Sequence, residues 1–195
     1  MRLFTIAACG LALALSPSAG LAQAREGAQA ATAPPSAASL RSGLAGRWTG
    51  ALGYRDYQTD ELFELPVTTT IVQVADGITQ VRTSLFDDGP GNPVWITSVS
   101  LLDAAAGTVT SASWRAGRPV EPITERVSVA GWRDDRHWTL IYDSLAEDDD
   151  QPAEIRVTET RDGDRVMSVK AVRPFGGDDS AWRFRNQTRL TRTGD

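Results

Sequence analysis

The strongest constraint on the fold is a period-two alternation of apolar and polar residues that recurs along most of the chain. In residues 137–143, Trp138, Leu140 and Tyr142 alternate with polar neighbours. Such alternation is typical of strands with one buried face and one solvated face. The pattern predicts ten strands, over residues 47–57, 63–74, 78–86, 94–102, 108–114, 123–129, 137–143, 153–161, 165–173 and 182–192.

Short turn signals separate these runs, and no stretch of a dozen residues combines a helical period with helix caps. Asp162-Gly163 is the clearest signal, because glycine after aspartate accepts the positive φ of a tight hairpin turn. Closely spaced strands favour an antiparallel meander, and closing the meander removes exposed sheet edges. We therefore predict a single all-β domain, an antiparallel up-and-down β-barrel of eight to ten strands, with a β-sandwich as the alternative.

The N-terminus has the pattern of a secretory signal peptide. Arg2 precedes an apolar run over residues 3–15, and a small-x-small cleavage site follows at Ala22-Gln23-Ala24. The run is shorter than the roughly 20 residues of a transmembrane helix. We predict cleavage after Ala24 and export, to the periplasm of a bacterium. Cys9 could instead carry a lipoprotein anchor, but the apolar run continues past it to a better cleavage site.

Residues 25–40 are rich in Ala, Ser and Pro, and this composition predicts a disordered linker before a barrel domain over residues 41–195. Cys9 is the only cysteine, so the mature chain would have no disulfide and would depend on packing. Removing Arg2 changes the net charge from −5 to −6. The absence of a basic cluster excludes nucleic acid as an expected partner.

The first predicted strand begins with Gly46-Arg47-Trp48. This resembles the Gly-x-Trp signature of lipocalins and related β-barrels, in which the Trp seals one end of the barrel and a late Arg packs across it. Parity along the last strand places Arg192 on the inward face, and antiparallel closure brings it beside Trp48. We therefore predict that Gly46, Trp48 and Arg192 close one barrel end, through a cation–π contact.

The chain departs from lipocalins in having no predicted helix before its last strand, no Thr-Asp-Tyr signature and no disulfides. It is more similar to helix-poor relatives that end on a strand. Some of those bind haem through a His, and their first strand reads Gly-x-Trp-x-Gly-x-Gly. Here Leu52 stands in place of the last Gly, and we predict no cofactor.

Motifs for catalysis and metal binding are weak. His137 is the only histidine, and its parity with Thr139 and Asp143 places it on the solvated face. It cannot form a multi-His zinc site, and no Gly-x-Ser-x-Gly nucleophile turn occurs. The acidic run 147–150 lacks the glycine and spacing of a calcium loop, so we interpret it as a solvated turn. We predict no catalytic or metal-binding residues, and enzymatic activity is the least favoured function.

Aromatic side chains are the best indication of a ligand, because they are spread over most predicted strands. A barrel of this size is either filled by side chains or encloses one small molecule. We therefore predict a binding protein for a small apolar or amphipathic ligand. The alternative is an envelope accessory protein with a filled barrel. The residues predicted to contact the ligand are Tyr54, Asp56, Trp95, Trp114, Trp138 and Tyr142.

Overall fold

The computed structural model describes residues 35–55, 59, 61–120 and 122–194. These form ten β-strands, one short α-helix and one 3-10 turn. The predicted signal peptide lies outside the described residues. The elements are α1 (Ala37–Ser42), β1 (Gly46–Arg55), β2 (Leu62–Gln73), β3 (Thr79–Asp87), β4 (Pro93–Asp103), β5 (Thr108–Arg115), β6 (Pro122–Asp134), β7 (His137–Asp148), β8 (Gln151–Asp162), β9 (Arg165–Pro174), η1 (Asp179–Ala181) and β10 (Arg183–Gly194).

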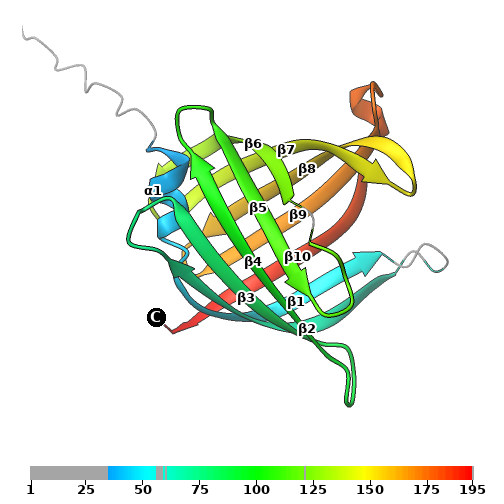
Figure 1. Ribbon diagram of the computed structural model, residues 1–195, viewed down its shortest axis with the longest axis horizontal. Helices are drawn as coiled ribbons and strands as arrows, with labels where there is room; N and C mark the ends of the chain where they lie inside the picture. Colours follow the sequence, from blue (N-terminus) through cyan, green and yellow to red (C-terminus); the bar gives the residue numbers. More distant parts are fainter. Residues whose placement is uncertain (1–34, 56–58, 60, 121, 195) are drawn as a thin grey trace, which may run out of the picture. The chain divides into compact units, whose positions relative to one another are not determined.

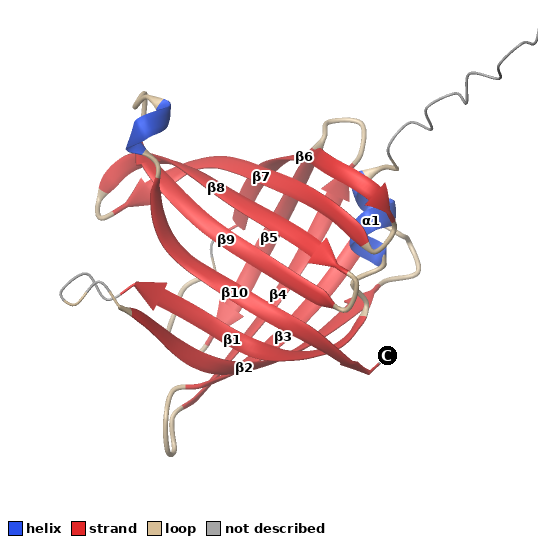
Figure 2. Cartoon of the chain, turned by 180° about the vertical axis from the view of Figure 1, so that it is seen from behind, coloured by secondary structure: helices blue, strands red, loops and turns tan. Residues whose placement is uncertain are grey.

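The strands form one closed antiparallel barrel in which every strand pairs with its neighbours in sequence (Figure 1). The barrel closes where β10 pairs with β1, with Trp48 opposite Arg192. Figure 2 shows the same closure from behind. This confirms the predicted up-and-down barrel, and all ten predicted strands are present. No helix among the described residues is long and apolar enough to cross a membrane.

A bulge in β10 changes which side chains face the interior. The register between β10 and β9 shifts between Phe184 and Asn186. Asn186 pairs with inward-facing Tyr54, but Trp182 stacks on Arg156 and Arg173 on the outer face. Strict alternation along the last strand, the parity that places Arg192 on the inward face, would also place Trp182 and Phe184 inside. One inserted residue reverses that assignment, because side chains alternate with a period of two.

Helix α1 covers one barrel end, the end where β1 starts and β10 finishes. Leu40 and Leu44 are buried there with Trp48 and Trp138. The Ser36 side chain caps the helix, and its hydroxyl accepts from the Ser39 amide at 3.3 Å. The composition of residues 25–40 had predicted a linker up to Leu40. The ordered domain begins earlier, because burial of Leu40 and the cap support a helix that composition does not indicate.

Two arginines hold the loop after α1 against this closed end. Arg192 Nη1 and Nη2 donate to the carbonyls of Ala45 and Gly43 at 2.7 and 2.8 Å. Arg161 Nη1 donates to the Gly43 carbonyl at 2.8 Å. Gly46 has a φ of +134°, and a Cβ there would lie 2.5 Å from Arg192 Nη1. Position 46 requires glycine, because both the positive φ and the close approach of Arg192 exclude a side chain there.

Candidate functional site

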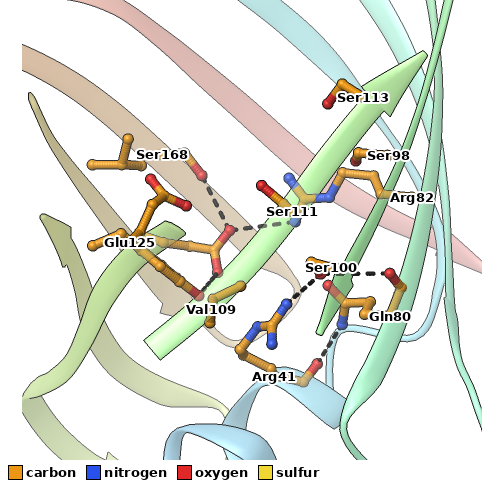
Figure 3. Close-up of a pocket in the computed structure, with 13 residues that line it drawn as sticks. Arg41, Gln80, Arg82, Ser98, Ser100, Val109, Ser111, Ser113, Glu125 and Ser168 are labelled. Carbon is orange, nitrogen blue, oxygen red and sulfur yellow. Dashed lines mark hydrogen bonds and ion pairs between the residues drawn. The ribbon is translucent and has the colours of Figure 1, made fainter. Parts of the chain in front are cut away.

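The barrel interior contains a polar cavity of about 240 Å³, which we call the inner chamber (Figure 3). Strands β4 and β5 supply two serines each, and a fifth comes from β9. In this region the inward side chains are therefore mostly hydroxyls and charged groups. The lining residues are Arg41, Gln80, Arg82, Ser98, Ser100, Val109, Ser111, Ser113, Glu125, Tyr142, Val157, Glu159 and Ser168.

One network in the chamber is satisfied within the protein. Buried Glu159 pairs with Arg82, whose Nη2 lies 3.3 Å from Glu159 Oε2. Ser168 Oγ donates to the same carboxylate oxygen at 3.2 Å, and the Tyr142 hydroxyl donates to Oε1 at 3.5 Å. Burial, followed by the negative charge of Glu159, raises the pKa of Tyr142. Tyr142 therefore stays protonated and serves as a hydrogen-bond donor.

Two other charged groups of the chamber have no partner of opposite charge. Arg41 is 6% exposed, and its Nη2 donates to Ser100 Oγ at 2.6 Å. No salt bridge among the described residues includes Arg41 or Glu125, and the Glu125 carboxyl makes no hydrogen bond to another described side chain. Burial raises the pKa of Glu125, and the charge of Arg41 lowers it by a smaller amount. These two groups face the cavity (Figure 3).

A second, smaller cavity of about 160 Å³ lies next to the chamber, and we call it the waist. It shares Arg82 and Ser98 with the inner chamber. It shares Phe86 and Ile96 with a third cavity of about 330 Å³ at the barrel end opposite Trp48, which we call the mouth pocket. The mouth pocket is lined by Leu52, Tyr54, Phe63, Leu65, Phe86, Asp88, Val94, Ile96 and Arg115.

The lining changes in character from the mouth pocket to the inner chamber. The mouth pocket is built mainly from aliphatic and phenyl side chains, with Tyr54, Asp88 and Arg115 as its polar groups. Burial raises the pKa of Tyr54, and Arg115 opposes that effect. The waist mixes apolar groups with Thr69 and Ser84, which hydrogen-bond to each other at 2.9 Å. The interior is therefore apolar at its mouth and polar at its inner end.

The structure places three of the predicted ligand residues inside the barrel, in different positions. Tyr54 lines the mouth pocket and Tyr142 lines the inner chamber. Trp138 is buried beneath α1, and its Nε1 donates to the Asp135 carbonyl at 3.1 Å, so it belongs to the closed end. Asp56 lies outside the described residues. Tyr54 and Tyr142 thus mark two ends of the series of cavities.

Trp95 and Trp114 lie on the outer face of the barrel, in contrast to the prediction. They are 58% and 46% exposed, and neither lines a cavity of the interior. On β4 the inward set includes Ile96 and Ser98. Both faces of β4 carry apolar residues, so alternation alone does not identify the inner one. The large Trp side chains indicated the wrong face, because serines occupy the inward positions of β4 and β5.

The closed end brings together Gly46, Trp48 and Arg192, the residues predicted to close the barrel. Trp48 is fully buried, and its Nε1 donates to the Leu44 carbonyl at 2.9 Å. The guanidinium carbon of Arg192 lies 4.6 Å from the centroid of the Trp48 ring. Gly46 leaves the space that Arg192 occupies. These residues lie at the end opposite the mouth pocket, so they shape the barrel and do not line its opening.

His137 does not reach the cavities. Its Nδ1 lies 2.7 Å from Asp134 Oδ1, and its Nε2 lies 3.3 Å from Asp162 Oδ1, at the start of β7. A haem ligand would have to face the interior, so the only histidine of the chain does not fit that role. Among the described residues, no group of three or more His, Cys, Asp or Glu side chains is arranged to hold a metal ion.

Comparison with known proteins identifies the fold alone. No protein-family model matches the chain, and no curated protein matches it. The barrel is similar to a solved structure. That structure is described as the crystal structure of Rv2717c from M. tuberculosis, with a TM-score of 0.54 and 18% sequence identity. The match covers 82% of this chain and 99% of the other.

Sequence reasoning missed Arg41, Glu125 and the serines as candidate site residues. The serines did carry a signal, because Ser98, Ser100, Ser111 and Ser113 follow the period of two along neighbouring strands. That pattern also fits a solvated outer face. Only the closure of the barrel shows which face of β4 and β5 points inward, and Arg41 is brought inside by the unpredicted helix α1.

Proposed function

We propose that this protein binds one small amphipathic molecule inside the barrel. The apolar part of the ligand would occupy the mouth pocket, and its polar end would pass the waist into the inner chamber. One observation carries this proposal: three adjacent cavities share lining residues and change from apolar to polar along the barrel. Ligand sites typically combine an apolar wall with a few convergent polar groups.

The cavities also bear on the two rival functions. An accessory protein with a filled barrel would have side chains in place of the inner chamber and the mouth pocket, whose volumes are about 240 and 330 Å³. Buried polar side chains that point into an open cavity are costly unless water or a ligand satisfies them. A serine hydrolase with a histidine base would need His137 beside a chamber serine. His137 does not line the chamber and instead contacts Asp134 and Asp162.

Native mass spectrometry of the purified chain tests the proposal. We expect a fraction of the protein to carry an added mass of a few hundred daltons, which denaturation releases. Ser98→Trp should abolish the added mass, because Ser98 lines both the chamber and the waist. Thr97→Trp is the matched control, since Thr97 is paired with outward Trp114 on the outer face. Equal retention by both variants would place the ligand elsewhere and contradict the proposal.

We also propose that the chain is exported and cleaved after Ala24. The support is the sequence pattern of residues 1–24, with a basic start, an apolar run and a small-x-small site. Intact-mass measurement of protein expressed from the full gene in a bacterium should give a chain that begins at Arg25 in the periplasmic fraction. A chain that keeps residues 1–24 in the cytoplasmic fraction would contradict this proposal.

A further inference from the structure

Arg41 belongs to helix α1, which covers one barrel end, and its side chain lines the inner chamber. Its carbonyl accepts from Gln80 Nε2 at 3.0 Å, and its Nη2 donates to Ser100 Oγ, so both ends of the residue are positioned. A guanidinium carries five N–H donors in a planar fork that matches a carboxylate. A buried charge is costly unless it is paired. The remaining donors of Arg41 therefore favour an anionic group in the chamber.

Glu125 provides the opposite charge from strand β6. It lies opposite Val109, which lines the same chamber, and its carboxyl points into the cavity (Figure 3). Arg41 is close enough to affect the titration of Glu125, but the two groups form no salt bridge. Arg82 is already engaged by Glu159. Apart from the Arg82–Glu159 pair, the charged residues that line the chamber are Arg41 and Glu125, which face the same space and do not pair with each other.

A single ligand group that carries both charges would satisfy both residues. An anionic group can accept two parallel hydrogen bonds from Arg41, and an ammonium can donate to Glu125. Ser98, Ser111 and Ser113 make no hydrogen bond to another described side chain, so their hydroxyls remain available to the same head group. The apolar remainder of such a molecule would extend through the waist, between Phe86 and Ile96.

We propose that the inner chamber recognises a zwitterionic head group, with a carboxylate on Arg41 and an ammonium on Glu125. This inference rests on the proposed function, because it names the head group of the amphipathic ligand. The ligand class is then a small molecule of amino-acid type with an apolar tail. Charge pairing on both sides gives the specificity, since a ligand with one charge leaves either Arg41 or Glu125 unpaired.

Isothermal titration calorimetry on the full chain at pH 7 tests this with four probes that share a ten-carbon skeleton. The probes are 2-aminodecanoate, decanoate, decylamine and decanol. The three charged probes are used below their micelle concentrations, and decanol is used below its solubility limit. We expect 2-aminodecanoate to bind at least about tenfold more tightly than each of the others, a difference of roughly 1.4 kcal/mol. Equal affinity for all four would overturn the head-group inference and leave the proposed function standing. Binding of none would overturn both.

Two variants separate the roles of the charges. Glu125→Gln should make 2-aminodecanoate and decanoate bind equally, and Arg41→Gln should make 2-aminodecanoate and decylamine bind equally. Glu64→Gln and Arg189→Gln make the same chemical changes in an ion pair on the outer surface, and they should keep the preference for the zwitterion. Circular dichroism melting checks the fold of each variant. If Arg41→Gln fails to fold, Glu125→Gln decides: an unchanged preference would overturn the proposal.

Discussion

The closed end of the barrel and the inner chamber differ in how their polar groups are satisfied. At the closed end, the indole N–H of Trp48 and the guanidinium of Arg161 donate to backbone carbonyls. Arg192 stacks on Trp48 and also donates to carbonyls of the loop after α1. In the inner chamber, Arg41 and Glu125 are charged groups that form no salt bridge among the described residues.

This difference separates residues that build the fold from residues that are available to a ligand. A buried polar group that is satisfied by the chain itself contributes to stability and to one defined arrangement. A buried polar group that is left facing a cavity lowers stability, and water or a ligand must satisfy it. Substitutions at the closed end should therefore destabilise the protein. Substitutions of unpaired chamber residues should affect binding and cost little stability.

The largest expected effect is that of Trp48→Ala. This change removes a fully buried indole, its hydrogen bond to Leu44 and its contact with Arg192. We expect the free energy of unfolding to fall by about 3–5 kcal/mol. Urea denaturation followed by circular dichroism measures it. Trp95→Ala is the matched control on the outer face, where we expect a loss of less than about 1 kcal/mol. Similar losses for both would show that Trp48 does not close the barrel.

Arg192→Ala should have the second-largest effect. The change leaves the Ala45 carbonyl without its charged donor and leaves the Gly43 carbonyl with Arg161 as its remaining donor. It also removes the cation–π contact with Trp48. We expect a loss of about 2 kcal/mol. Arg156→Ala removes a similar stack, on Trp182 at 4.8 Å, from the outer surface. Because solvent screens that pair, its loss should stay below about 1 kcal/mol. An equal loss in the two variants would mean that burial adds nothing to the Arg192 contact.

The closed end could be predicted from the sequence because its signals are local or follow strict parity. Gly46 and Trp48 form a short motif, and continuous alternation from Asn186 places Arg192 on the inward face. The interior was harder, because its composition contradicts the usual rule that apolar residues face inward. Trp95 and Trp114 were assigned to the inside on that rule, and the serines of β4 and β5 occupy the inside instead.

Two features could not be predicted from the sequence at all. The bulge between Phe184 and Asn186 reverses the parity of the residues before it, and no residue type in that segment marks it. Helix α1 is only six residues long and follows an Ala/Pro/Ser-rich segment, so helix propensity does not predict it. Leu40 of the helix and Leu44 of the following loop are both buried in the core, and Arg41 of the helix lines the chamber. The candidate site thus depends on the least predictable element.

Glu125→Gln tests whether the carboxyl of Glu125 in the inner chamber makes the stability of the protein depend on pH. Burial raises the pKa of Glu125 above its unfolded value, so between these two values the folded state binds more protons than the unfolded state. This contribution to stability is complete at a pH below the unfolded value and declines as pH rises through the folded value. The free energy of unfolding of Glu125→Gln, relative to that of wild type, should therefore be higher at pH 7.5 than at pH 4. Urea denaturation at both pH values checks the sign, and no difference would mean that Glu125 is well solvated.

The smallest expected effect belongs to Asp134, on the surface of the closed end. Hydrogen bonds from His137 first, and then from the Arg136 amide, lower the pKa of Asp134 from 3.8 to about 2. Because the folded pKa is depressed, this contribution to stability is present above pH 3.8 and is lost as pH falls through about 2. Asp134→Asn should thus be slightly less stable than wild type at pH 6 and equal to it near pH 2. The carbon chemical shift of the Asp134 carboxyl, followed by NMR, reads the same titration directly. A midpoint near pH 4 would show that the hydrogen bonds to Asp134 are not maintained in solution. In that case, only the buried polar contacts of the closed end would be ordered.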